Sequence, residues 1–361
     1  MLKKWKICAA AFALGGLLCC PLSGSAAEND SKFAHLSFMG GYLESHPTTQ
    51  EVFVPFMEAA EKKFDGRLSF DYFATNELYS EAEAYSAISD GRSDIGMVRP
   101  SLFPMKMRLL SVVSLPGMCP NAVVGSLVVE ELIQKFPEVR AELPSGTVHF
   151  TSWASAPYQL HTVMPVRSRE DLKGKKIAVW DATTMEFVKA LGAQAVRMSS
   201  SDTFLALSRG MVDGVLCPLA PLRSYKISDE TRYHLLIGLG VNTFTAESNK
   251  KLWDSMSADM RKWLSSQGGL VMAKACGISL EHTALAEVEW MKSQGHEFTV
   301  LSEEEREAFL EPLEVFVEKW KTEFCKGLDA KVVDNVYKFA RERSKYHTEQ
   351  MRAGKYGEFK I

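Results

Sequence analysis

Short strand-like segments alternate with longer helix-like segments through the first two thirds of the chain. The former are apolar or alternating runs, and the latter carry apolar residues at helical spacing. The predicted strands are 33–38, 67–74, 94–98, 161–166, 176–180, 194–198, 214–219 and 234–240. The predicted helices between them are 47–64, 80–91, 183–192 and 201–214. Because this β-α-β rhythm occurs twice, we expect an α/β protein with two lobes.

The last third of the chain is predicted to be helical. Asn249 is a predicted N-cap, and a long amphipathic stretch covers about residues 268–295. Ser302 and Glu305 form a capping-box pattern at the start of a further helix. The polar segment after about Tyr346 is expected to fray.

The N-terminus has the pattern of an export signal. Three lysines within the first six residues precede an apolar run over 7–20, and Ser25 and Ala27 suit the −3 and −1 sites of signal peptidase. The run is shorter than the roughly 20 residues of a membrane span. We therefore expect a signal peptide over 1–27, cleaved near Ala27, and a periplasmic protein. A retained N-terminal anchor and lipidation of a cysteine in this region are the alternatives.

Charge and cysteine content narrow the protein class. Removing residues 1–27 takes away three lysines and no acids, so the formal net charge falls from −3 to −6. A mildly acidic chain without a Lys/Arg stripe is not typical of nucleic-acid binding. Four cysteines remain, far apart and without a CxxC motif, and both a disulfide and buried free thiols fit this spacing. They are Cys119, Cys217, Cys276 and Cys325.

The sequence carries no recognised catalytic signature. HExxH, GxSxG and Walker A motifs are absent, and GLG at 238–240 lacks the third glycine of a dinucleotide fingerprint. The eight histidines show no metal-ligand spacing; single ones such as His149 and His161 are usually packed or exposed residues. We expect no enzyme activity, metal or cofactor. Only Cys217 stands out as a candidate nucleophile, should the protein be an exported enzyme.

One block, RSREDLKGKKIAVW…ALGAQAVRMSSSDTFLALSRGMVDG over 167–214, resembles a known family. It is similar to the extracytoplasmic solute-binding subunit of tripartite ATP-independent periplasmic (TRAP) transporters of the DctP type. In that family a DLKG turn enters a strand, and a later helix ends in a V-D-G motif. Weaker matches follow the family order at AISDGRSDIGMV (87–98), VSLPGM (113–118) and NKKLWDSMSADMR (249–261). The resemblance covers nearly the whole chain after the signal.

The resemblance implies a two-lobed periplasmic-binding-protein fold, type II-like, with a mixed sheet flanked by helices in each lobe and one long helix bracing both. The implied function is capture of a small organic acid and its delivery to the small and large TRAP permease subunits, with no catalysis. A ligand-presenting sensor is the alternative role, and we expect a monomer. The expected boundaries are 28–155 and about 243–281 for lobe I, 156–242 and about 282–345 for lobe II, and 346–361 for a C-terminal tail.

The implied site departs from the family pattern at three positions. The family arginine that forks onto the ligand carboxylate is expected in a KIRV run, but the run here is KIAV and places Ala178 there. Tyr158 stands where sialic-acid-binding members have a second arginine. Cys217 stands where an asparagine often follows the V-D-G motif. The usual carboxylate clamp is thus missing from its usual place.

Charged and hydroxyl residues elsewhere could compensate. Arg99, directly after a predicted strand, could supply the missing positive charge, or a local acid such as Asp94 could hold it at the surface. Glu81 at a helix start could accept an ammonium group, or serve as a first-turn acid favoured by the helix dipole. Thr183 at another helix start could hold an anion, or act as a cap.

Aromatic residues are the remaining candidates for the ligand site. Trp153, Tyr158 and Trp180 are expected on or beside segments of lobe II, and Phe38 and Tyr42 at the end of the first strand. Aromatic walls bury large flat areas and stack on rings, while packing in the core is the alternative for each. One arginine in an apolar site favours an aromatic or amino-acid-like monocarboxylate over a short dicarboxylate.

Overall fold

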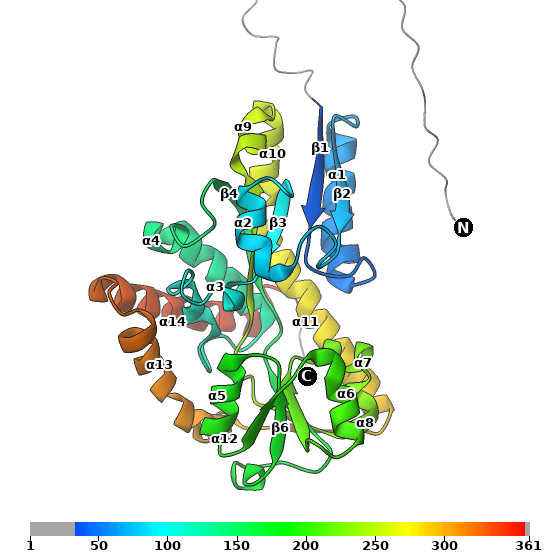
Figure 1. Cartoon of the computed structure of the whole chain (residues 1–361), viewed down its shortest axis with the longest axis vertical. Helices are drawn as coiled ribbons and strands as arrows, with labels where there is room; N and C mark the ends of the chain where they lie inside the picture. The colour runs from blue at the N-terminus through cyan, green and yellow to red at the C-terminus, as the bar shows by residue number, and fades with distance from the viewer. Residues whose placement is uncertain (1–32, 358–361) are drawn as a thin grey trace, which may run out of the picture.

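Two β-sheets, one in each of two lobes, organise the part of the chain that the computed structural model describes, residues 33–357 (Figure 1). The predicted signal peptide lies outside these residues. Within them, no helix is long and apolar enough to cross a membrane. The prediction of a two-lobed α/β fold with a mixed sheet in each lobe is confirmed.

The sheet of lobe I has the strand order β2-β1-β3-β10-β4. Its strands are β1 (Ala34–Met39), β2 (Leu68–Phe73), β3 (Ile95–Val98), β4 (Thr147–Ala154) and β10 (Thr243–Asn249). β1 runs parallel to β2 and β3, whereas β10 is antiparallel to both β3 and β4. The strand that arrives late in the chain is therefore inserted between two earlier ones.

Helices flank this sheet. They are α1 (Val54–Lys63), α2 (Ala84–Ser89), α3 (Ala122–Lys135), α4 (Pro137–Arg140), α9 (Lys250–Ser255) and α10 (Ala258–Gln267), with a π-helical turn at Thr49–Phe53 and 3₁₀ turns at Glu81–Glu83, Pro100–Leu102 and Leu110–Ser114. Asn121 caps α3 by accepting a 2.9 Å hydrogen bond from the Val124 N–H. The predicted cap at Asn249 is also confirmed, since its side chain accepts from the N–H groups of Lys251 and Leu252.

The sheet of lobe II has the strand order β11-β9-β5-β8-β6-β7. Its strands are β5 (Gln159–Thr162), β6 (Lys176–Val179), β7 (Gln194–Arg197), β8 (Gly214–Cys217), β9 (Tyr233–Leu236) and β11 (Glu297–Val300). Its helices are α5 (Ala182–Ala190), α6 (Ser200–Ser208), α7 (Pro221–Ser224), α8 (Ile227–Glu230) and α12 (Glu303–Leu310), with a 3₁₀ turn at Glu170–Leu172. The strand predicted at 161–166 ends earlier, ahead of Pro165, which has no N–H to donate to a ladder.

A single long helix, α11 (Gly269–Ser293), runs from one lobe into the other (Figure 1). Its first half buries Met272, Cys276 and Leu280 in a core cluster of lobe I. Its second half buries Val288 and Met291 in a core cluster of lobe II. The predicted bracing helix is thus present, close to the predicted range.

The C-terminal helices return to lobe I, which corrects the predicted boundaries. A 3₁₀ turn (Glu311–Leu313), α13 (Val315–Lys319), a π-helical turn (Trp320–Phe324) and α14 (Ala330–Arg352) follow α12. We expected residues up to 345 in lobe II and a frayed tail beyond. Instead Val336 packs with core residues of lobe I, and His347 is still buried within α14. The apolar face of α14 keeps helical spacing past residue 345, so the helix stays docked.

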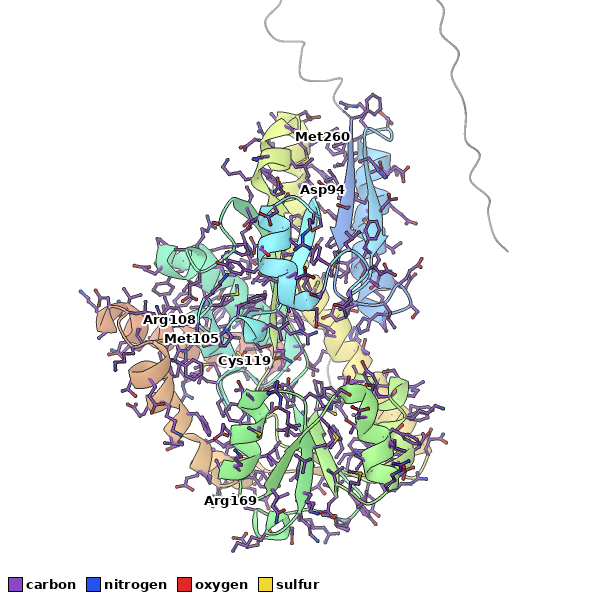
Figure 2. The ribbon with its side chains drawn as sticks, in the orientation of Figure 1. Asp94, Met105, Arg108, Cys119, Arg169 and Met260 are labelled. Atoms are coloured by element: carbon purple, nitrogen blue, oxygen red, sulfur yellow. The ribbon has the colours of Figure 1, made fainter. Side chains whose placement is uncertain are left out.

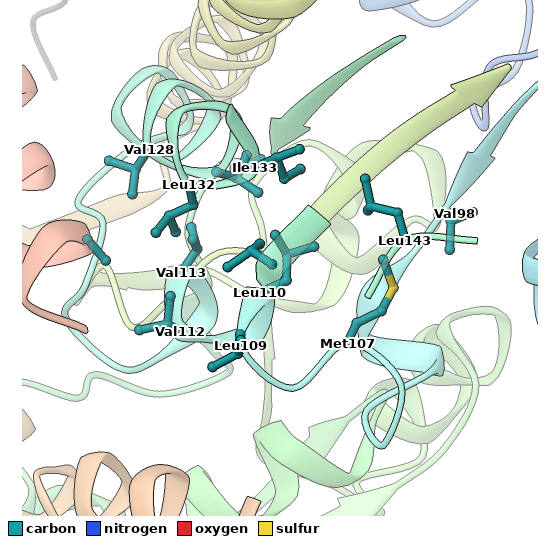
Figure 3. Packing of buried hydrophobic residues seen from close by; sticks show 14 of the residues in the cluster. Val98, Met107, Leu109, Leu110, Val112, Val113, Val128, Leu132, Ile133 and Leu143 are labelled. Atoms are coloured by element: carbon teal, nitrogen blue, oxygen red, sulfur yellow. The ribbon is translucent and has the colours of Figure 1, made fainter. Parts of the chain in front are cut away.

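One of the core clusters of lobe I is largely aliphatic (Figure 3). Leu110, Val113 and Leu132 are each fully buried in it, and Val128 from α3 packs there too. Each such side chain contributes about 1.5–3 kcal/mol on burial. Val98 of β3 belongs to this cluster, as do Met107 and Leu109 of the segment that follows β3. The cluster therefore fixes the position of that segment, which begins with Arg99.

Candidate functional site

Arg99 and Glu81 form an ion pair at the edge of lobe I that faces lobe II. Arg99 directly follows β3, and Glu81 opens the 3₁₀ turn after β2. Figure 2 shows Asp94, before β3, near the outer end of the upper lobe and Met105, after β3, on its side nearer the lower lobe. The Arg99 Nη2 lies 2.7 Å from Glu81 Oε1, and the side chains are 32% and 20% exposed.

Asp94 does not hold Arg99. Its Oδ2 accepts hydrogen bonds of 2.8 Å from both the N–H and the hydroxyl of Ser37, across the sheet. The alternative in which Asp94 fixes Arg99 at the surface is therefore not what the structure shows, and Glu81 takes that place. Two residues predicted separately as ligand contacts are brought together.

The pair keeps unused hydrogen-bonding capacity. Arg99 Nε and Glu81 Oε1 are both buried, and neither has a hydrogen-bond partner among residues 33–357. The close Nη2–Oε1 contact is thus an ion pair without the angle of a hydrogen bond. Buried polar atoms usually find partners, since leaving one unpaired costs about 1–3 kcal/mol.

An aromatic wall lies beside Arg99. The guanidinium carbon is 5.5 Å from the ring centroid of Phe244 in β10, which in turn packs against Trp153 and Tyr42. The Trp153 indole N–H donates a 2.9 Å hydrogen bond to the Tyr42 hydroxyl. Tyr42 also stacks on His46 with centroids 4.3 Å apart. Arginine and aromatic faces attract one another, so this wall fixes the direction of the guanidinium.

Two of the predicted aromatic contacts belong to the core. Trp153 is fully buried in β4 of lobe I rather than beside lobe II, and supports Tyr42 from behind. Phe38 is fully buried between Phe53 and Tyr72, with ring centroids 5.1 and 5.9 Å away. Packing, the alternative considered for each, describes both in this structure.

Tyr158 lies where the chain crosses between the lobes. Its hydroxyl accepts a 2.6 Å hydrogen bond from the Asn242 side-chain amide and donates a 3.4 Å one to Asp181 Oδ2. Burial raises the pKa of Tyr158, the negative charge of Asp181 raises it further, and the positive charge of Arg99 opposes them. The positive charge of Arg99 in lobe I is therefore close enough to act on Tyr158, where the chain enters lobe II.

The start of α5 is already occupied by a carboxylate. Asp181 caps this helix by accepting a 2.8 Å hydrogen bond from the Thr184 N–H. Thr183, predicted to hold an anion or to cap, is exposed and is not the capping residue. A carboxylate at the cap repels a second anion there, which argues against an anion site at Thr183.

Lobe II contributes one partly exposed aromatic pair. Trp180 donates a 3.0 Å hydrogen bond from its indole N–H to the Thr203 hydroxyl, and its ring lies 6.0 Å from that of Tyr225. Tyr225 is 41% exposed. Of the aromatic residues predicted in lobe II, Trp180 is the one with ring surface still free.

A family model described as "Bacterial extracellular solute-binding protein, family 7", or DctP, matches residues 40–323. The chain belongs to this family. The membership confirms the resemblance noted in the sequence, and this family 7 protein is a member of a receptor family rather than an enzyme family. Its match spans both lobes and the helix α11 that joins them.

Curated relatives of this family 7 protein carry related names. It is 26% identical to the C4-dicarboxylate-binding periplasmic protein DctP of Rhodobacter capsulatus, over 72% of this chain and 78% of that protein. It is 25% identical to the C4-dicarboxylate-binding protein DctB of Bacillus subtilis, over 58% of this chain and 60% of that protein. The chain thus spans less than two thirds of the second relative.

Solved structures share the fold of this family 7 protein at low identity. A TRAP periplasmic solute binding protein from Desulfovibrio salexigens, in an open complex, aligns with a TM-score of 0.79 and 23% identity, over 87% of this chain and 96% of that one. A TRAP solute binding protein from Rhodoferax ferrireducens, with copurified benzoate, gives 0.76 and 22%, over 88% and 99%. The two-lobed architecture is therefore that of TRAP solute-binding proteins.

Two positions that the resemblance implies as ligand contacts are inaccessible to solvent in this family 7 protein. Ala178 and Cys217 are both fully buried in a core cluster of lobe II. Burial raises the pKa of the Cys217 thiol well above its ordinary value, so it is not an activated nucleophile. All four described cysteines are free and buried, and residues 33–357 contain no cluster of three or more metal-ligating side chains.

Sequence reasoning missed three residues around the site. Phe244 and Asn242 lie in and before β10, a strand that the pattern did not predict. Asp181 had a usable signal, since an aspartate directly before a predicted helix is a favoured N-cap. Asn242 had none, because its contact with Tyr158 depends on the two chain crossings lying side by side.

Two cavities lie away from these residues. One, of about 10 Å³, is enclosed by apolar side chains inside lobe II, including Leu160 and Ile177. The other, of about 410 Å³, is lined by residues that include Phe33, directly before β1, and Leu252 of α9. Because β1 and β3 are parallel, that recess lies at the opposite end of the sheet from Arg99. The site is therefore defined by its charges and aromatic rings.

Proposed function

We propose that this protein captures a small organic acid in the periplasm and delivers it to the two membrane subunits of a TRAP transporter. The observation that carries the proposal is Arg99, held by Glu81 on the edge of lobe I that faces lobe II, with an unused buried Nε. A guanidinium presents parallel N–H groups that match a carboxylate. Arg99 takes over the charge that the family arginine would supply at Ala178.

The surrounding rings suit a ligand with apolar surface. Phe244 lies beside Arg99 in lobe I and packs against Tyr42, while Trp180 and Tyr225 offer ring surface from lobe II. Closure of the two lobes would bring these groups around one ligand, with binding free energy stabilising the closed state. The benzoate-bound relative from Rhodoferax ferrireducens supports an aromatic acid, and the C4-dicarboxylate-binding relatives support a carboxylate.

Native mass spectrometry of the purified protein, followed by denaturation and identification of released molecules, tests the proposal first. A released carboxylic acid is expected. Arg99→Ala should then weaken binding of that acid by about 1.5–3 kcal/mol, the range for a hydrogen bond to a charged group, or roughly ten- to a hundredfold in Kd. Isothermal titration calorimetry measures this change.

Arg92→Ala is the matched control. Arg92 belongs to the same lobe and also pairs with a glutamate, Glu83, but both side chains are well exposed. Its removal should leave the Kd within about twofold, as expected for an exposed pair. Equal affinities for Arg99→Ala and the unchanged protein would show that the carboxylate binds elsewhere.

A further inference from the structure

The charges of Arg99 and Glu81 cancel before any ligand arrives. The two groups are 2.7 Å apart and only 32% and 20% exposed, so their attraction is weakly screened. Asp181, which bonds the Tyr158 hydroxyl, adds a further negative charge on the lobe II side. The site as a whole therefore has no net positive charge that would attract an anion.

A plain monocarboxylate would upset this balance. Bound to Arg99, it would place a second carboxylate beside Glu81 and leave one uncompensated negative charge between the lobes. Two carboxylates that share one cation in a partly dry site repel each other, and an unpaired buried charge is strongly unfavourable. A ligand that carries its own positive charge next to its carboxylate avoids this cost.

The buried atoms that lack a hydrogen-bond partner also favour a ligand that carries both charges. Arg99 Nε is a buried donor without a partner, and Glu81 Oε1 is a buried acceptor without a hydrogen bond. They belong to side chains in direct contact, so one ligand group must accept while a neighbouring group donates. A carboxylate accepts only, and an ammonium donates only. An amino group on the carbon next to a carboxylate supplies both side by side.

We propose that the ligand is a zwitterionic amino acid, whose carboxylate binds Arg99 and whose ammonium binds Glu81. This inference rests on the proposed function and narrows its substrate class. The Phe244 ring beside Arg99 also favours a cation, because aromatic faces attract ammonium groups. Glu81 is then the residue that selects amino acids over other organic acids.

Two sets of matched acids test the inference by calorimetry. Phenylacetate, mandelate and phenylglycine differ only in carrying hydrogen, hydroxyl or ammonium on the same carbon, and propionate, lactate and alanine form the same series without a ring. Both enantiomers are used where they exist, and succinate serves as a dicarboxylate. In the set that binds, the amino acid should bind at least tenfold tighter than its partners.

Glu81→Gln supplies the decisive comparison. The change should weaken binding of the amino acid at least tenfold and tighten binding of the plain acid severalfold. The second effect is expected because the change frees Arg99 and removes the repulsion between Glu81 and the ligand carboxylate. Glu44→Gln, which removes an exposed charge from the same lobe, should change neither by more than about twofold. If Glu81→Gln fails to fold, Glu81→Asp keeps the charge but withdraws it, and should weaken only the amino acid.

The outcomes separate this inference from the proposed function. Tighter binding of a plain acid, a hydroxy acid or succinate than of the amino acid would overturn the zwitterion and leave organic-acid capture standing. Equal weakening of all three members of a set by Glu81→Gln would do the same. No binding of any acid, together with no acid released from the purified protein, would overturn the proposed function and this inference with it.

Discussion

His149 lies between two buried carboxylates of lobe I. Its Nε2 is 3.0 Å from Glu130 Oε2 and its Nδ1 is 2.9 Å from Glu247 Oε1, while the Ser152 hydroxyl donates to Glu130 at 2.7 Å. Burial by itself would lower the pKa of His149, but the charges of Glu247 and Glu130 outweigh it and raise the pKa to about 10. At neutral pH the residue is a buried imidazolium that ties α3, β4 and β10 together.

This raised pKa predicts a loss of stability in alkali. The folded pKa of about 10 exceeds the ordinary 6.5, so the contribution of charged His149 is complete below about pH 6.5 and is lost as pH rises through 10. Urea unfolding should show a fall of a few kcal/mol between pH 7 and 10, at about 1.4 kcal/mol per pKa unit. His149→Gln should be less stable at pH 7 and lack this fall. If His149→Gln still lost stability between pH 7 and 10, another group would be responsible for the titration.

Single residues were predictable where their role is local. Arg99 and Glu81 were both proposed as ligand contacts, from the family resemblance and from their places beside predicted elements, although not as partners of each other. His149 was expected to be a packed or exposed residue, because nothing in the sequence reveals that Glu130 and Glu247 meet it. Partners so far apart in the chain become neighbours only when the sheet forms.

At the scale of elements, α3 and α11 approach each other closely at Gly277. An added Cβ there would lie 2.8 Å from Val123 Cα and 3.0 Å from the Ala122 carbonyl oxygen, both backbone atoms. One turn further along α11, Glu281 accepts a 3.0 Å hydrogen bond from the Ala122 N–H. The helix that braces the lobes is therefore set directly against the backbone of lobe I.

Gly277→Ala tests this packing, because two effects oppose each other. In an exposed helix the change would stabilise by about 1 kcal/mol through helix propensity. Here the backbone of α3 must move, and overpacking costs about 1–3 kcal/mol. We expect net destabilisation in urea unfolding, whereas Val271→Ala, at a position 60% exposed on the same helix, should have little effect. A more stable Gly277→Ala would mean that the helices can separate freely.

Buried elements were predicted from sequence where they form an apolar run, as β3 and β8 do, and α3 and β10 were missed. α3 is buried at most of its positions, so it lacks the polar face that reveals an amphipathic helix. β10, TFTAESN, is buried at every residue, yet carries polar side chains. Among these, Glu247 pairs with His149, whereas Thr245 Oγ1 and Ser248 Oγ have no hydrogen-bond partner among the described residues. Neither periodicity nor hydrophobicity could mark such a strand. β4 and β11 were missed as well.

At the scale of the whole molecule, four connections join the lobes: two short chain crossings, α11, and the segment from α12 to α14 that returns to lobe I. The crossings, 155–158 and 237–242, lie side by side, with hydrogen bonds of 2.8 Å from Ser155 N to Asn242 O and 2.9 Å from Tyr158 N to Gly240 O. The Tyr158 hydroxyl links Asn242 in one crossing to Asp181 at the start of α5. Bending at the crossings would therefore be transmitted to α5.

Tyr158→Phe tests this link. The change removes one hydroxyl and leaves Asn242 and Asp181 without their shared partner, so we expect ligand affinity to fall by about 1 kcal/mol, or roughly fivefold. Calorimetry with the tightest acid of the panel measures the affinity. Small-angle X-ray scattering should show a smaller ligand-induced decrease in radius of gyration. Unchanged values in both would give Tyr158 a packing role alone.

The insertion of β10 between β3 and β4 has a consequence for biogenesis. Lobe I cannot complete its sheet until the ribosome has made the chain through Asn249, and α14 docks only after Arg352 has been made. Neither lobe is one continuous stretch of chain, so neither sheet is complete in an emerging N-terminal half. Folding of lobe I is thereby postponed until its late segments have been made, which fits the proposed periplasmic location.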